Sequence, residues 1–147
     1  MTRGGRFRFS LETVLKVRGL REEQAKLQVA LAEKELERSR LALEQTKERR
    51  RQLVADLDSG VKEWTPQEFS LFKAYLEHLK ITLDDLQNRI AEQIADLQEK
   101  REVLKQRYQE RRLLEKLKEK HYAIFRREMR KLMENETEAI VLGRWNL

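Results

Sequence analysis

The chain has 147 residues, of which 39% are charged and 39% are apolar, and its net charge is +6. A compact domain averages roughly 25% charged residues, so this balance is typical of long helices and coiled coils. Five glycines and one proline leave few points at which a helix would break. The absence of cysteine excludes disulfides and thiolate metal sites. Disorder is the competing interpretation of so polar a chain, but the regular leucine spacing described below argues against it.

The sequence contains no sign of a membrane or secretory segment. No apolar run approaches the roughly 20 residues needed to cross a bilayer. The N-terminus, "MTRGGRFRFS", is basic but lacks the apolar centre of a secretory signal. We therefore expect a cytoplasmic protein without direct membrane insertion.

The first long helix is expected over residues 11–57, behind a basic N-terminal arm of residues 1–10. Ser10 is a suitable N-cap ahead of "LETVL". Gly19 lies inside this helix and costs about 1 kcal/mol relative to alanine.

A turn is predicted over residues 58–65, just before the only proline of the chain. Gly60 can take the left-handed conformation that ends a helix. In "TPQE", Thr65 is placed to be an N-cap and Glu68 to be its partner in a capping box. Pro66 suits the first helical position, where its missing N–H would be unpaired in any case.

The second helix is expected over residues 66–139, followed by a tail of residues 140–147. Its apolar residues follow the 3-4 spacing of a coiled-coil seam. The seam begins with Phe69, Phe72, Leu76, Leu79, Leu83, Leu86 and Ile90. A small change of phase follows, and the seam continues through Ile94, Leu97, Leu104 and Tyr108.

The first helix has a looser seam that small and polar residues interrupt: Val29, Ala32, Leu36, Ser39, Leu43, Thr46, Arg50, Leu53 and Leu57. A second apolar stripe lies beside it, at Leu20, Leu27, Leu31 and Leu41. This helix either buries a wide face or exposes part of it to a partner.

Two helices joined by a short loop fold back antiparallel. The fold class predicted is therefore all-α: two long helices in an antiparallel coiled-coil hairpin that forms a single domain of residues 1–147. Pairing Leu57 with Pro66 places Leu11 near residue 112. The second helix then overhangs the first at the end that carries the termini, by roughly 40 Å.

The positive charge is concentrated at this overhanging end. Residues 1–21 carry +5 and residues 105–132 carry +7, whereas residues 22–104 carry −4 and residues 133–147 carry −2. Such a basic end is either a solvated helix surface or a site that docks on an acidic protein surface. The interleaved glutamates, and the lack of any known nucleic-acid-binding signature, disfavour nucleic acid as the partner.

The overhang also carries an apolar stripe for which the first helix supplies no partner. Its members are Leu113, Leu114, Leu117, Ile124, Phe125, Met129 and Leu132. Such a stripe is expected to bind another protein or a second copy of the chain.

The sequence offers no catalytic, cofactor-binding or metal-binding site. His78 and His121 lie 43 residues apart, without ligand spacing around either. There is no phosphate-binding loop and no nucleophile paired with a base. Trp64 and Trp145 are more typical of tryptophans that pack at the surface than of residues in a catalytic or binding site. We expect a protein that acts through contacts and is not an enzyme.

Two stretches of the sequence resemble the flagellar export protein FliJ family. "FRFSLETVLKVRGLREEQAKLQVALAE" is similar to the family's N-terminal pattern, with an aromatic-basic start followed by L-x-x-VL-x-x-R and E-x-x-A. "RRLLEKLKEKHYAIFRREMRKLMENETEAI" is similar to its C-terminal pattern of a basic core, an aromatic residue and an acidic close. The ending "AIVLGRWNL" departs from the family, which commonly ends in an acidic segment.

The resemblance implies an antiparallel coiled coil like the central stalk of rotary ATPases. It also implies a cytoplasmic component of the flagellar type III export apparatus, peripherally associated with the inner membrane. The implied partners are the hexameric export ATPase, the cytoplasmic domain of the export gate protein, and export chaperones.

Residues of the basic end are candidates for contact with the ATPase ring: Phe7, Arg8, Phe9, Arg111, Arg112, Lys116, Lys118 and Arg127. The family's gate contact maps to Phe72 and Leu76, although both also belong to the seam and are therefore candidates for burial. On the facing helix, Ala42, Gln45 and Arg49 replace the more apolar residues expected in the family.

Three alternatives remain open at this point. The chain can be the equivalent stalk of a virulence-type secretion system or of a rotary ATPase. It can also be a dimeric structural coiled coil joined through the overhang. A rod that binds nucleic acid is the third alternative.

Overall fold

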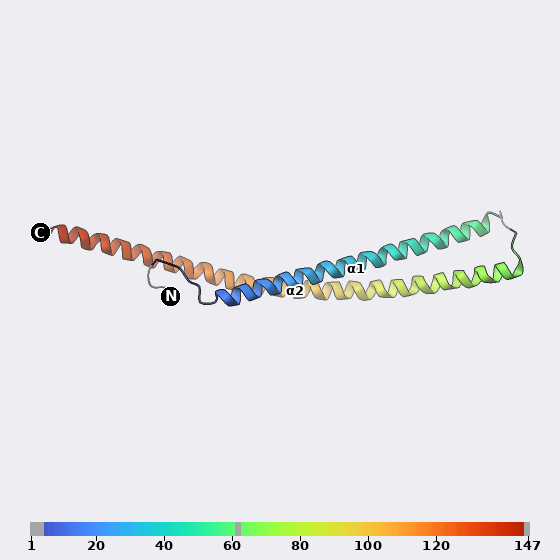
Figure 1. The fold of residues 1–147 in the computed structure, drawn as a ribbon, viewed down its shortest axis with the longest axis horizontal. Coiled ribbons are helices and arrows are strands. Elements are labelled where there is room, and N and C mark those ends of the chain that lie inside the picture. The colour runs from blue at the N-terminus through green and yellow to red at the C-terminus, as the bar shows by residue number, and fades with distance from the viewer. Residues whose placement is uncertain (1–4, 61–62, 146–147) are drawn as a thin grey trace. The chain divides into compact units, whose positions relative to one another are not determined.

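The computed structural model describes residues 5–60 and 63–145. Two helices account for nearly all of this part: α1 (Glu12–Asp58) and α2 (Pro66–Trp145), of 47 and 80 residues. They run antiparallel on either side of one turn (Figure 1), and no strand occurs within the described ranges. The predicted all-α helical hairpin is confirmed.

The turn has the chemistry that its sequence predicts. Gly60 has a φ of 63°, in the left-handed region that glycine adopts without steric cost. The Glu68 amide donates to the Thr65 hydroxyl oxygen at 3.2 Å, and the Thr65 amide donates to the Glu68 carboxylate at 3.3 Å. These two bonds form the capping box that begins α2.

The helix boundaries differ from the predicted ones at three places, of which the end of α1, at Asp58 instead of Leu57, differs by a single residue. α1 begins at Glu12, and the carbonyl of Leu11 accepts its first helical hydrogen bond, from Leu15, so Leu11 takes the N-cap position predicted for Ser10. α2 continues to Trp145, six residues beyond the predicted end at Ala139. Residues 140–145 contain one glycine and no proline, so nothing in them stops a helix that is already formed.

The chain divides into two compact units. Unit 1 comprises residues 1–25 and 104–147, and unit 2 comprises residues 26–103. In each unit a part of α1 packs against a part of α2.

The core of unit 2 follows the predicted seams. On α1 the buried residues are Val29, Ala32, Leu36 and Ser39, and on α2 they are Phe72, Leu79, Leu83, Leu86 and Leu97. The buried side chains are mostly small on α1 and large on α2, a combination that suits close packing of two helices. The second stripe of α1 stays in solvent: Leu27, Leu31 and Leu41 are 49–58% exposed. Of the two alternatives left open by the sequence, α1 therefore exposes part of its apolar surface.

The register of the hairpin in unit 1 is shifted from the predicted one. The sequence places Leu11 near residue 112, but the ammonium group of Lys118 contacts the carboxylate of Glu12 at 2.8 Å. The difference is about two helical turns. The predicted register depends on pairing Leu57 directly with Pro66, so an error of a few residues in that pairing is carried to every pair along the two helices.

Candidate functional site at the chain termini

Unit 1 is the strongly basic part of the molecule. It contains 18 lysine and arginine residues against 10 aspartate and glutamate residues, a net charge of +8, whereas unit 2 contains 14 against 16, a net charge of −2. The candidate site is therefore built here, from the N-terminal arm, the first turns of α1 and the C-terminal half of α2.

The N-terminal arm lies against α2. The ring of Phe9, which is 6% exposed, meets His121 edge-on at a centroid distance of 5.5 Å. The ring of Phe7 lies 5.2 Å from that of Tyr122 and 5.5 Å from that of Phe125. These two rings cover about one turn of α2, from His121 to Phe125. The sequence predicts no intramolecular partner for α2 beyond residue 112. This prediction is wrong for the part of α2 up to Phe125, which packs against α1 and the arm.

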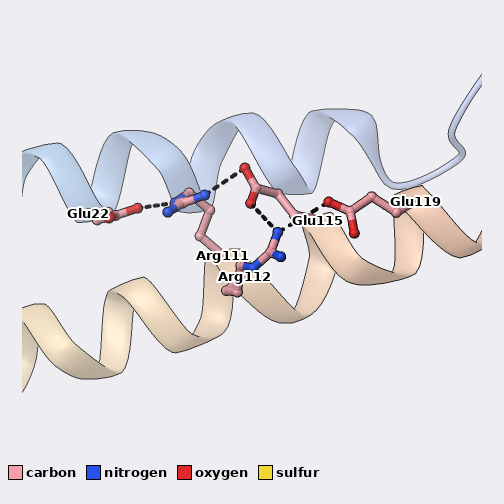
Figure 2. A network of polar contacts seen from close by, with 5 residues as sticks. All are labelled: Glu22, Arg111, Arg112, Glu115 and Glu119. Carbon is pink, nitrogen blue, oxygen red and sulfur yellow. Dashed lines mark hydrogen bonds and ion pairs between the residues drawn. The ribbon is translucent and has the colours of Figure 1, made fainter.

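A buried carboxylate joins the two helices next to this arm. Glu22 on α1 is 4% exposed, and its carboxylate accepts a hydrogen bond from Nε of Arg111 on α2. Nη1 of Arg111 also lies 2.6 Å from a carboxylate oxygen of Glu115. Figure 2 shows the guanidinium of Arg111 between these two acids, one from each helix. The hydrogen bond with Glu22 is the main reason that the pKa of Arg111 is raised.

Arg112 extends the same network along α2. Its Nη1 atom donates to Glu115 at 3.1 Å and to Glu119 at 3.2 Å (Figure 2). The pKa of Arg112 is raised by these bonds, with Glu115 the larger cause. Glu115 receives both arginines, and its pKa is lowered, mainly by the hydrogen bond from Arg112. All five charged side chains are thus held in one connected arrangement.

A second pair of contacts ties α1 to α2 on either side of this network. Lys118 pairs with Glu12 at the start of α1, and Nη1 of Arg18 donates to the backbone carbonyl of Glu110 at 3.3 Å. Three of the predicted contact residues therefore form ion pairs within the chain: Arg111, Arg112 and Lys118.

The remaining predicted contact residues differ from these in exposure. Arg8, Lys116 and Arg127 are exposed and have no ion-pair partner among the described residues. Beyond Phe125, α2 is covered by neither α1 nor the described arm, and nearly all of its side chains to Trp145 are exposed, including Leu132, Ile140 and Leu142. The predicted overhang is present in this part of unit 1.

The two residues proposed for gate contact belong to unit 2. Phe72 is 7% exposed and packs against Trp64 at a centroid distance of 5.0 Å, as its place in the seam predicts. Leu76 is half-buried, and next to it the Tyr75 hydroxyl accepts a hydrogen bond from Arg49 of α1.

The described residues contain no group of three or more side chains placed to hold a metal ion. Within the same residues, neither helix has a stretch both long and apolar enough to span a bilayer.

Comparison with protein-family models matches residues 7–137 to the flagellar FliJ protein family. The chain belongs to the FliJ family. Comparison with curated proteins and with solved structures gives no match.

Membership of the FliJ family makes this chain a component of the flagellar protein export apparatus, in a family of structural, non-enzymatic components. The matched range includes every charge of the network in Figure 2.

Sequence reasoning missed Glu22, the acid that α1 contributes to that network. Glu22 continues the seam of α1 backwards with the same 3-4 spacing, through Ala25 to Val29. A glutamate at a seam position opposite a basic segment was the available signal for a buried ion pair.

Proposed function

We propose that this FliJ-family chain is a non-enzymatic stalk that inserts unit 1 into the hexameric export ATPase ring and links the ring to the export gate. The observation that carries the proposal is the net charge of +8 on unit 1, together with an exposed C-terminal part of α2 beyond Phe125. A basic helical end of this kind suits the inside of a ring lined by acidic side chains and helix C-termini.

The eight candidate ring residues divide into two roles under this proposal. Arg8, Lys116 and Arg127 are exposed and contact the ring directly. The other five set the shape of the end: Phe7 and Phe9 hold the arm, Arg111 and Lys118 hold α1 against α2, and Arg112 joins Glu115 and Glu119 along α2.

Gate contact is assigned to Leu76, with Phe72 beneath it as support. Leu76 retains exposed surface, whereas Phe72 has almost none, so a gate protein reaches Leu76 without opening the hairpin. Export chaperones are proposed as further partners, and the protein is proposed to be cytoplasmic and peripherally associated with the inner membrane.

Charge reversal of the three exposed cations tests insertion into the ring. In Arg8→Glu/Lys116→Glu/Arg127→Glu, we expect the concentration of stalk that half-maximally stimulates the export ATPase to rise about tenfold or more, with a weaker dependence on salt. The matched control reverses three exposed cations of unit 2, Lys34→Glu/Arg38→Glu/Arg89→Glu, and changes the net charge equally. Equal effects of the two triple variants would show that only the overall charge matters, and would contradict insertion through unit 1.

Sedimentation of the free chain tests the competing dimeric coiled coil. We expect a monomer at micromolar concentration, because the seams of α1 and α2 are already used within one hairpin. A dimer that also fails to stimulate the ATPase would favour the structural alternative.

A further inference from the structure

Unit 2 contains a cationic groove in a part of the molecule that is otherwise acidic. A cavity of about 630 Å³ opens between α1 and α2. We define the cationic groove by the side chains that line it and enter the argument: Lys47, Arg50, Arg51 and Val54 from α1, and Lys80 and Leu83 from α2. Asp84 is the one carboxylate among its described lining residues.

The positive charge of this groove is only partly neutralised. Lys47 lies 3.8 Å from Glu44, and Arg51 lies 2.8 Å from Glu48. Arg50 and Lys80 line the groove from opposite helices, and neither has an ion-pair partner among the described residues. The groove therefore offers two unpaired cations that face one occupant from two sides.

The groove coincides with the weakest part of the seam of α1. Arg50 and Thr46 stand at positions where a coiled coil places apolar residues, and the Thr46 hydroxyl is bonded instead to the Ala42 carbonyl at 2.8 Å. Leu83 of α2 still forms an apolar floor, being 8% exposed, and Val54 forms an apolar rim at 38% exposed. A third helix could lay apolar side chains on this floor and rim while its charged flanks meet the cations.

We propose that the cationic groove is a docking site for an acidic amphipathic helix of a partner protein. This site goes beyond the ring and gate contacts of the proposed function, since none of their candidate residues lines it. The apolar face of the incoming helix covers Val54 and Leu83, and its carboxylates pair with Arg50 and Lys80. Nucleic acid fits less well, because no aromatic side chain among the described lining residues offers a surface on which bases can stack.

The probe is a fluorescent peptide of about 21 residues, three heptads with leucine at the seam positions and glutamate on both flanks. A second peptide carries lysine at the same flanking positions. We expect the full-length protein to bind the acidic peptide at least about tenfold more tightly than the basic one, by fluorescence anisotropy. Equal affinity for the two peptides would overturn the proposal.

Substitution in the groove locates the binding site. Arg50→Glu/Lys80→Glu should weaken binding of the acidic peptide about tenfold or more, whereas the matched reversal Arg38→Glu/Arg89→Glu should leave it unchanged. Both control residues are exposed cations of unit 2 that do not line the groove. If both double variants lose affinity equally, the peptide responds to net charge alone and the proposal fails.

Two further measurements keep the outcome unambiguous. Arg50→Gln/Lys80→Gln removes the cations without adding negative charge. It should also weaken binding of the acidic peptide while circular dichroism shows unchanged helix content.

A single-stranded oligonucleotide of the same charge should compete poorly with the acidic peptide. Competition as strong as that of the unlabelled peptide would identify a general polyanion site and overturn the proposal. Loss of ATPase stimulation in the unit 1 variants with peptide binding retained would separate a failure of the stalk proposal from a failure of this one.

Discussion

Glu22 illustrates how a single side chain can both stabilise and specify a helical hairpin. A buried carboxylate is costly to desolvate unless it is paired, and Arg111 supplies the pair from the opposite helix. A one-turn slip of α1 along α2 would separate the buried carboxylate of Glu22 from Arg111. The pair therefore favours one register in a unit where apolar residues alone would allow several.

Removing the carboxylate of Glu22 tests this role. Glu22→Ala should lower the free energy of unfolding by about 1–3 kcal/mol, because Arg111 loses its main interhelical partner while it remains largely covered. Urea denaturation followed by circular dichroism measures the change. Glu35→Ala, at an exposed position of α1, should change the stability by less than about 0.5 kcal/mol.

The lowered pKa of Glu115 predicts how stability depends on pH. A carboxyl group whose folded-state pKa lies below its ordinary value of 4.5 stabilises the fold above that pH, and the stabilisation is lost as the pH falls through the folded-state pKa. The melting temperature should therefore fall on acidification below about pH 4.5, and Glu115→Gln should show a smaller fall over the same range. An identical pH profile for the variant would exclude Glu115 as a source of the dependence.

At the scale of elements, the sequence predicts most where the determinants are local. The turn follows from Gly60 and the Thr65–Glu68 capping box, because the residues that make these contacts are neighbours in the chain. The register and the docked arm were not predictable in this way. They depend on contacts such as Phe9 with His121 and Glu12 with Lys118, whose partners lie more than 100 residues apart.

The capping box provides the test at this scale. Thr65→Ala should destabilise the start of α2 by about 1 kcal/mol, because the Glu68 amide loses its acceptor. Thr65→Ser keeps a hydroxyl oxygen at the same place and should retain most of that stability. Thermal unfolding of the two variants side by side gives the comparison; equal losses would mean that the hydroxyl does not cap the helix.

For the molecule as a whole, the sequence already gives the distribution of charge, since a basic N-terminal region and a basic stretch of the second helix must meet in any antiparallel hairpin. The candidate site was predicted less well than this distribution. Of its eight residues, Arg111, Arg112 and Lys118 proved to be internally paired, whereas Arg8, Lys116 and Arg127 are exposed. The pairs that join the two helices depend on the register, which spacing along one helix does not determine.

The difference in packing along the chain predicts where a protease acts first. Beyond Phe125 α2 has no packed partner among the described residues, and an isolated helix of this length is only marginally stable in water. Brief digestion with trypsin should cut first at the exposed basic residues of the segment 126–131 and leave a fragment that retains both units' paired helices. Mass spectrometry identifies the first cut. Initial cleavage at Arg38 or Arg89, which are exposed on paired helices, would contradict this order.

The docking of the N-terminal arm has a consequence for synthesis on the ribosome. Phe7 and Phe9 are made more than 100 residues before His121, Tyr122 and Phe125, on which they rest. Throughout translation of the intervening chain these two aromatic rings have no place to pack. A nascent chain thus leaves both rings open to whatever binds apolar peptides until α2 has been made as far as Phe125.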